Sequence, residues 1–91
     1  MQMYGKLVLI LPDGDEQSFE LAKTEVVIGR GVESDIVLAD GRVSRAHARL
    51  ECGPSGCYLV DLGSANGSFL NGGRVERARL SPGDMRVSFA W

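Results

Sequence analysis

The stretch CYLVDLGSANGSFLNGGRV, residues 57–75, combines two runs of strand-forming residues with clusters of turn formers. In its first run every second residue is apolar: Tyr58, Val60 and Leu62. This alternation is the period of a strand with one buried face, so we expect these three side chains in the core. The Asn-Gly-Gly triplet at 71–73 follows the second apolar run and predicts a β-hairpin.

Glycine and proline divide the rest of the chain into similar short pieces, with 12 glycines among 91 residues. The pieces rich in strand formers are residues 6–11, 17–21, 25–28, 35–38 and 85–91. Short strands with a turn about every 8–12 residues predict an all-β fold, either a sandwich or a barrel. A chain of this length is expected to form one domain.

The segment 42–52 allows two interpretations. A helical stripe would contain residues spaced three and four apart: Val43, Ala46, His47 and Leu50. A strand would contain alternate buried residues instead: Ala48, Leu50 and Cys52. The local pattern slightly favours a helix. The surrounding strands favour a strand, because a lone helix would need its own face to pack on.

The formal net charge of −2 argues against general nucleic-acid binding, because such domains are normally basic. The charges are unevenly distributed along the chain. Residues 1–40 hold eight acidic and three basic residues, whereas residues 41–91 hold four acidic residues and seven arginines. Arginine suits bidentate contact with phosphate or carboxylate, so this bias points to contact with anions.

The sequence shows no signal for a membrane or for secretion. Its longest apolar run, residues 7–11, is far shorter than the ~20 residues that span a bilayer. No basic segment followed by a long apolar stretch begins the chain. We therefore expect a cytoplasmic protein with reduced cysteines. The predicted core faces also place Cys52 and Cys57 on opposite sides of their hairpin, so we expect both thiols to be free.

Five motifs follow one another with characteristic spacing. They are Gly29-Arg30, Ser34-Asp35-Ile36-Val37-Leu38, Val43-Ser44-Arg45-Ala46-His47-Ala48, DLGSANGSFLNG at 61–72, and Leu80-Ser81-Pro82-Gly83-Asp84. Each motif alone is weak, but the five in this order resemble the forkhead-associated (FHA) domain family over nearly the whole chain. The resemblance implies a two-sheet antiparallel β-sandwich of about eleven short strands, whose loops at one end bind phosphothreonine in partner peptides.

The chemistry of that ligand is compatible with the residues in these motifs. A phosphothreonine carries about −1.5 to −2 charges and three acceptor oxygens, so its site needs an arginine, hydroxyl groups and backbone N–H donors. The resemblance implies phosphate contacts by Arg30, Ser44 and the backbone of Ala65. It implies peptide contacts by Arg45, Asn66 and Arg42, and structural roles for Gly29, His47 and Gly67.

Position 65 departs from the family, which commonly has threonine there. Ala65 lacks the hydroxyl, and a hydrogen bond to a charged group contributes about 1.5–3 kcal/mol. The departure lowers the expected affinity without removing Arg30 or Ser44. No cofactor or metal is expected, because the sole histidine, His47, has no cluster of cysteines or carboxylates around it in the sequence.

The favoured hypothesis is a phosphothreonine-dependent binding module for signalling or regulatory assembly. We expect a monomer, residues 1–91, that is cut from a longer protein and has no nucleic-acid or membrane partner. The alternative is a phosphate-independent interaction domain on the same fold, which Ala65 favours. A helix-turn-helix DNA reader using Arg42, Arg45 and Arg49 is opposed by the net charge. An enzyme is least favoured, because no nucleophile–base pair is visible.

Overall fold

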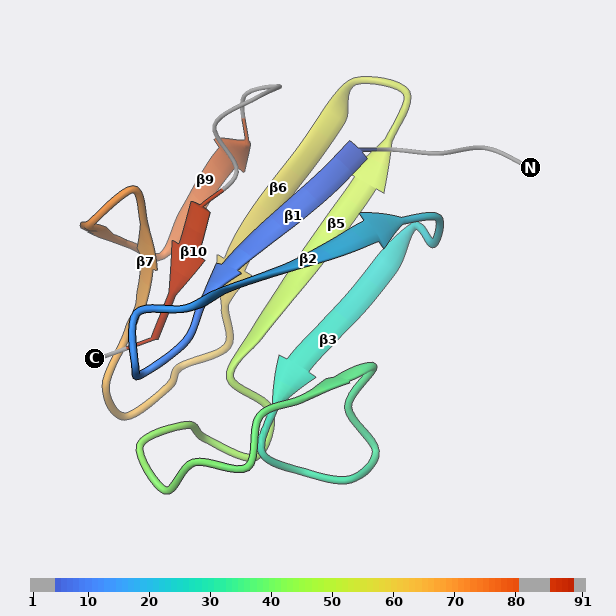
Figure 1. Ribbon diagram of the computed structural model, residues 1–91. Helices are drawn as coiled ribbons and strands as arrows, with labels where there is room; N and C mark the ends of the chain where they lie inside the picture. Colours follow the sequence, from blue (N-terminus) through green and yellow to red (C-terminus); the bar gives the residue numbers. More distant parts are fainter. Residues whose placement is uncertain (1–4, 81–85, 90–91) are drawn as a thin grey trace.

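The structure is a computed structural model that describes residues 5–80 and 86–89. Its regular elements are all strands, ten in the described residues, and they form two five-stranded sheets that share one core (Figure 1). None of the described elements is a helix able to cross a membrane. The predicted all-β sandwich is therefore confirmed, with a strand count close to eleven.

The first sheet has the order β2-β1-β10-β7-β8. Its strands are β1 (Gly5–Ile10), β2 (Glu16–Leu21), β7 (Ser68–Leu70), β8 (Gly73–Val75) and β10 (Arg86–Ser88). β1 and β2 form one antiparallel hairpin, and β7 and β8 form the hairpin predicted from the triplet at 71–73. Because β1 pairs with β10, strands from both ends of the chain lie side by side.

The second sheet has the order β4-β3-β5-β6-β9. Its strands are β3 (Glu25–Gly29), β4 (Ile36–Val37), β5 (Ala48–Gly53), β6 (Gly56–Asp61) and β9 (Arg77–Leu80). Each sheet of the predicted antiparallel sandwich also contains one parallel pair, β1–β10 in the first sheet and β3–β4 in the second. The predicted motif at 80–84 extends beyond the described residues, as do Met85, Ala90 and Trp91.

The ambiguous segment 42–52 contains a strand and no helix. Alternate residues of β5 are buried: Ala48, Leu50 and Cys52. Ala46, which a helical stripe would bury, is exposed. β5 pairs with β3 on one side and with β6 on the other, so hydrogen bonds to both neighbours outweigh the weak local preference for a helix.

The buried face of β6 is the opposite of the predicted one. Cys57 and Leu59 are buried, whereas Tyr58 and Val60 lie on the other face, where the Arg77 guanidinium stands 4.3 Å from the Tyr58 ring centroid. The cause is the register, which puts Leu59 directly opposite the buried Leu50. Residues opposite each other in an antiparallel pair share a face, so β5 decides which face of β6 enters the core.

The same register corrects the prediction of two free thiols. Cys52 and Cys57 lie directly opposite each other, with Cα atoms 4.1 Å apart, and their sulfurs form a disulfide. Both residues are buried. The prediction was wrong because it assumed that the Tyr58 face of β6 was in the core, which would have turned the two sulfurs apart.

Reducing the Cys52–Cys57 disulfide should lower the free energy of unfolding by about 2 kcal/mol, because the bond closes a short loop and restricts the unfolded chain only modestly. Urea unfolding followed by circular dichroism, with and without reductant, measures the change. A Cys52→Ala/Cys57→Ala double variant is the control and should respond to reductant no more than to buffer. If the wild-type free energy of unfolding is the same with and without reductant, the disulfide is absent.

Candidate functional site

Three loops meet at one end of the second sheet (Figure 1). Loop 30–35 follows β3, loop 38–47 leads into β5, and loop 62–67 follows β6. The Arg30 N–H donates to the Ser44 carbonyl at 2.9 Å, which joins loops 30–35 and 38–47 directly after β3. The nine predicted site residues all lie in or beside this three-loop site.

Gly29 allows loops 30–35 and 38–47 to approach each other closely. A Cβ on Gly29 would lie 2.1 Å from the carbonyl oxygen of Arg45, a distance that no real contact allows. The same oxygen accepts hydrogen bonds from the Gly31 N–H at 3.0 Å and from the Ser34 hydroxyl at 3.3 Å. The space that a side chain at position 29 would fill is therefore occupied by the backbone of the neighbouring loop.

His47 connects loop 38–47 to loop 62–67. Its ring is fully buried, and Nδ1 accepts a hydrogen bond from the Ser44 N–H at 3.0 Å. Nε2 lies 2.6 Å from the Gly67 carbonyl oxygen, so Nε2 carries the proton and donates it there. The ring also packs edge-on against Phe89 of the core, with centroids 4.7 Å apart. One neutral imidazole thus joins two loops and the core.

Ser44 and Ala65 are brought together by a direct hydrogen bond. The Ala65 N–H donates to the Ser44 Oγ at 3.2 Å. Because this bond uses the oxygen as acceptor, the hydroxyl proton of Ser44 can still be donated to another group. The Ala65 N–H, which we expected to contact phosphate, therefore donates to Ser44 instead. It would influence a bound ligand only by polarising the Ser44 hydroxyl.

Asn66 ties loop 62–67 to loop 38–47. Its Nδ2 donates to the Arg42 carbonyl oxygen at 2.8 Å, although the residue itself is exposed. The side chain therefore does more than shape its own Asn-Gly turn. Gly67 follows with a φ of +92°, a left-handed conformation that favours glycine.

Asp61 organises the interior of loop 62–67. Its Oδ1 accepts hydrogen bonds from the hydroxyls of Ser64 and Ser68, each at 2.6 Å, and its Oδ2 accepts one from the Ser64 N–H at 3.0 Å. Burial raises the pKa of Asp61, but these hydrogen bonds outweigh burial and leave the pKa below its usual value. Site prediction from the sequence missed these three residues, although an aspartate followed by serines at the third and seventh positions is a signal of side-chain-supported turns.

Arg30 presents its guanidinium in a fixed orientation. Its Nε donates to the Val43 carbonyl oxygen at 3.0 Å, and the residue is exposed. Within residues 5–80 and 86–89, neither terminal nitrogen of Arg30 has a hydrogen bond or an ion pair. Those two nitrogens can accordingly form the planar fork that carboxylates and phosphates accept.

The other two predicted arginines contact acidic neighbours. Arg42 makes a bidentate contact with Asp40, at 3.0 and 2.9 Å, and its guanidinium lowers the pKa of Asp40 to about 2. Arg45 lies 3.8 Å from Glu33, and both side chains are largely exposed. The pair with Asp40 has short, forked hydrogen bonds, whereas the contact with Glu33 is loose, so Arg45 is the more available of the two for a ligand.

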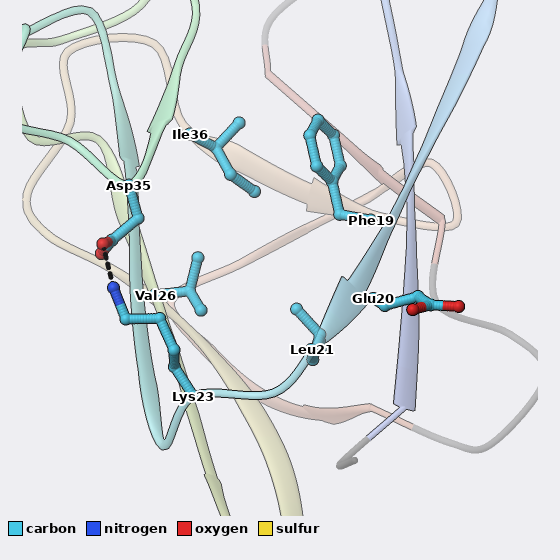
Figure 2. Close-up of a pocket in the computed structure, with 7 residues that line it drawn as sticks. All are labelled: Phe19, Glu20, Leu21, Lys23, Val26, Asp35 and Ile36. Carbon is cyan, nitrogen blue, oxygen red and sulfur yellow. Dashed lines mark hydrogen bonds and ion pairs between the residues drawn. The ribbon is translucent and has the colours of Figure 1, made fainter. Parts of the chain in front are cut away.

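A hollow lies at the edge of the sandwich between β2 and strands β3 and β4, and it shares Asp35 of loop 30–35 with the three-loop site (Figure 2). Its lining combines four apolar and three charged residues: Phe19, Leu21, Val26 and Ile36 with Glu20, Lys23 and Asp35. The Lys23 Nζ lies 2.5 Å from the Asp35 Oδ1, so these two charges neutralise each other. It contains none of the nine predicted site residues. The three-loop site, in contrast, presents exposed arginines and a serine hydroxyl, which are groups that can donate hydrogen bonds to an anion.

The titratable side chains of the described residues do not gather into a cluster of metal ligands. No group of three or more His, Cys, Asp and Glu side chains there could hold a metal ion. His47, the one histidine, is buried and uses both ring nitrogens in structural hydrogen bonds. At its surface the three-loop site presents hydrogen-bond donors and positive charge, above all from Arg30 and Ser44.

Comparison with known proteins identifies a family for this chain. The family model described as FHA domain matches residues 26–90. The ABC transporter ATP-binding/permease protein Rv1747 of Mycobacterium tuberculosis is 44% identical over 66 residues, which cover 72% of this chain and 8% of the transporter. The chain spans less than half the length of the first curated relatives it matches.

Solved structures agree with the family match. Mycobacterium tuberculosis EmbR in complex with a low affinity phosphopeptide has a TM-score of 0.74 and 29% identity, covering 87% of this chain and 21% of that chain. A structure from an analysis of phosphothreonine-dependent FHA domain interactions has a TM-score of 0.70 and 28% identity, covering 88% of this chain and 80% of that chain.

Replacing Gly29 by alanine should lower the free energy of unfolding by about 1–3 kcal/mol, because the new methyl group overpacks against the Arg45 carbonyl. Gly41→Ala in loop 38–47 is the matched control, since nothing lies within 4 Å of a Cβ there. Its effect should stay within about 0.5 kcal/mol. Urea unfolding of both variants measures the difference, and equal stability of the two would contradict the close approach.

Proposed function

Because the chain belongs to the FHA domain family, we propose that its three-loop site binds a phosphorylated threonine of a partner protein. An FHA domain is a binding module rather than an enzyme. Two of its structural neighbours were solved in work on phosphothreonine-dependent interactions or with a phosphopeptide. We propose a role in signalling or regulatory assembly for this domain, as a monomer in the cytoplasm and without nucleic acid or membrane.

One observation carries the proposal: Arg30 and Ser44 are joined through their backbones and both keep polar hydrogens to donate. The arginine fork would bind two phosphate oxygens, and the Ser44 hydroxyl would donate to the third. The Ala65 N–H polarises that hydroxyl, because a group that accepts one hydrogen bond donates another more strongly. Two negative charges on the phosphate make each of these hydrogen bonds charge-assisted.

The remaining site residues would hold the peptide beside the phosphate. Asn66 keeps its Oδ1 as an acceptor for a peptide N–H while Nδ2 donates to the neighbouring loop. Arg45 would contact the peptide from the exposed side of Ser44. Arg42 would contact the peptide only if a peptide carboxylate replaced Asp40, because Asp40 accepts both hydrogen bonds of the Arg42 fork.

A phosphate-independent interaction domain on the same fold is the second candidate. The observation in its favour is Ala65, whose methyl group offers no donor where the family commonly has a hydroxyl. The two candidates differ in one measurable respect, the dependence of binding on the phosphate group.

We propose a cytoplasmic location because the proposed ligand, a phosphorylated threonine, is an intracellular modification. A reducing compartment acts against the Cys52–Cys57 disulfide, so the two thiols would be reduced there.

Arg30→Ala should weaken binding of a phosphothreonine peptide about ten- to hundredfold, the worth of a charged hydrogen bond. Arg30→Lys should restore only part of the loss, because lysine lacks the planar fork. Arg79→Ala is the matched control, since Arg79 contacts the Ser55 carbonyl at the other end of β6. Calorimetry with the phosphorylated and the plain peptide measures all four proteins. Equal wild-type affinity for both peptides would reject the phosphate-dependent function.

Asp40→Asn should release Arg42 and raise the affinity for phosphopeptides with an aspartate after the phosphothreonine about two- to fivefold. Peptides with alanine at those positions should bind as before. Glu51→Gln is the control, because Glu51 also pairs with an arginine, Arg49 at 2.7 Å, but on the outer face of the sheet. Anisotropy titrations compare the variants. If the Asp40→Asn variant prefers aspartate-containing peptides no more than the wild type does, Arg42 does not bind the peptide.

A further inference from the structure

Arg74 lies against the backbone of loop 62–67, although it belongs to a different strand. It occupies the middle of β8, the edge strand of the first sheet, opposite Phe69 of β7. A Cβ on Gly67 would lie 2.7 Å from the Arg74 Nε, 3.0 Å from its Cζ and 3.3 Å from its Cδ. The guanidinium therefore rests where a side chain at position 67 would be, directly after Asn66.

The backbone under this guanidinium is held firmly. The Gly67 N–H donates to the Ser64 hydroxyl at 2.9 Å, and its carbonyl accepts from His47. Arg74 is itself exposed, on a strand paired with β7. A long side chain resting on a rigid surface loses less conformational freedom when it binds a ligand than one in open solvent.

The charge of Arg74 has no partner within residues 5–80 and 86–89. In that part of the chain each of the other seven arginines contacts an acidic side chain, a carbonyl oxygen or an aromatic ring: Arg30, Arg42, Arg45, Arg49, Arg77, Arg79 and Arg86. Arg74 makes no such contact there. This exposed guanidinium thus carries N–H donors without an acceptor in that part of the chain, beside the proposed peptide site.

We propose that Arg74 binds an acidic side chain of the partner peptide, at a subsite beyond Asn66 as seen from the phosphate. The inference rests on the proposed phosphothreonine function and adds a specificity-determining residue to it. A carboxylate is the ligand because it fits the fork of a guanidinium bidentately. Arg74 suits this role better than Arg42, whose fork is occupied by Asp40.

The geometry also limits where the acidic residue stands in the peptide. Ser44 and Ala65 mark the phosphate end of the site, and Arg74 sits over Gly67, two residues further along the loop. An extended chain advances about 3.3–3.6 Å per residue, so the carboxylate belongs about two to four positions from the phosphothreonine. The peptide positions at that distance define the subsite.

The test uses a phosphothreonine peptide with alanine at all other positions, and derivatives carrying one glutamate or one lysine at each position within four residues of the phosphothreonine. Wild type, Arg74→Gln, Arg74→Glu and the matched control Arg79→Glu are titrated by fluorescence anisotropy at low salt. Circular dichroism confirms that the variants are folded. The unphosphorylated peptide is titrated as well, so that the proposed function is tested separately.

Wild type should gain about three- to fivefold in affinity from glutamate at one or two positions, the upper range for an exposed charge pair. Arg74→Gln should lose that gain while it still requires the phosphate, and Arg74→Glu should prefer lysine at the same positions. Arg79→Glu should behave as wild type. Phosphate-dependent binding with the same glutamate preference in wild type and both Arg74 variants would overturn the role of Arg74. Loss of phosphate dependence in wild type would instead overturn the proposed function.

Discussion

The two hydrogen bonds of the buried His47 ring are the interaction on which the recognition end of this domain depends. Nδ1 accepts from the Ser44 N–H, and Nε2 donates to the Gly67 carbonyl. A neutral imidazole is suited to this position because it offers one acceptor and one donor on opposite sides of a rigid ring. Its packing against Phe89 places both loops relative to the core of the sandwich. The Leu62 N–H, which donates to the His47 carbonyl at 3.0 Å, adds a backbone link between the same two loops.

Around this ring, each loop satisfies its polar groups with the neighbouring loop. The Arg45 carbonyl fills the space above Gly29, the Ala65 N–H reaches the Ser44 hydroxyl, and Asn66 bonds the Arg42 carbonyl. The groups that a peptide would contact are therefore oriented before it arrives, which reduces the entropy cost of binding. The strands contribute by ending at the same end of the second sheet, so that the three loops are neighbours at all (Figure 1).

The arginines near this end of the domain differ in how far their charge is neutralised, and this difference carries the functional argument. Asp40 holds Arg42 in a fork, and Glu33 lies loosely beside Arg45. Among the described residues, by contrast, the two terminal nitrogens of Arg30 and the guanidinium of Arg74 have no acidic partner. A forked acid competes with a ligand for the same donors. The pattern of internal ion pairs can therefore set specificity as strongly as the pattern of arginines does.

The fold class, most strand positions and the residues that gather at the three loops could be predicted from the amino-acid sequence, because turn formers, periodicity and motif order can all be read along the chain. The sequence did not determine which face of β6 is buried, nor the Cys52–Cys57 bond, because both follow from the register against β5. The sequence also did not reveal the ion pair between Asp40 and Arg42 or the contact of the Arg74 side chain with Gly67. Those contacts join side chains that only the pairing of strands and the meeting of loops bring within reach, so tertiary structure decided them.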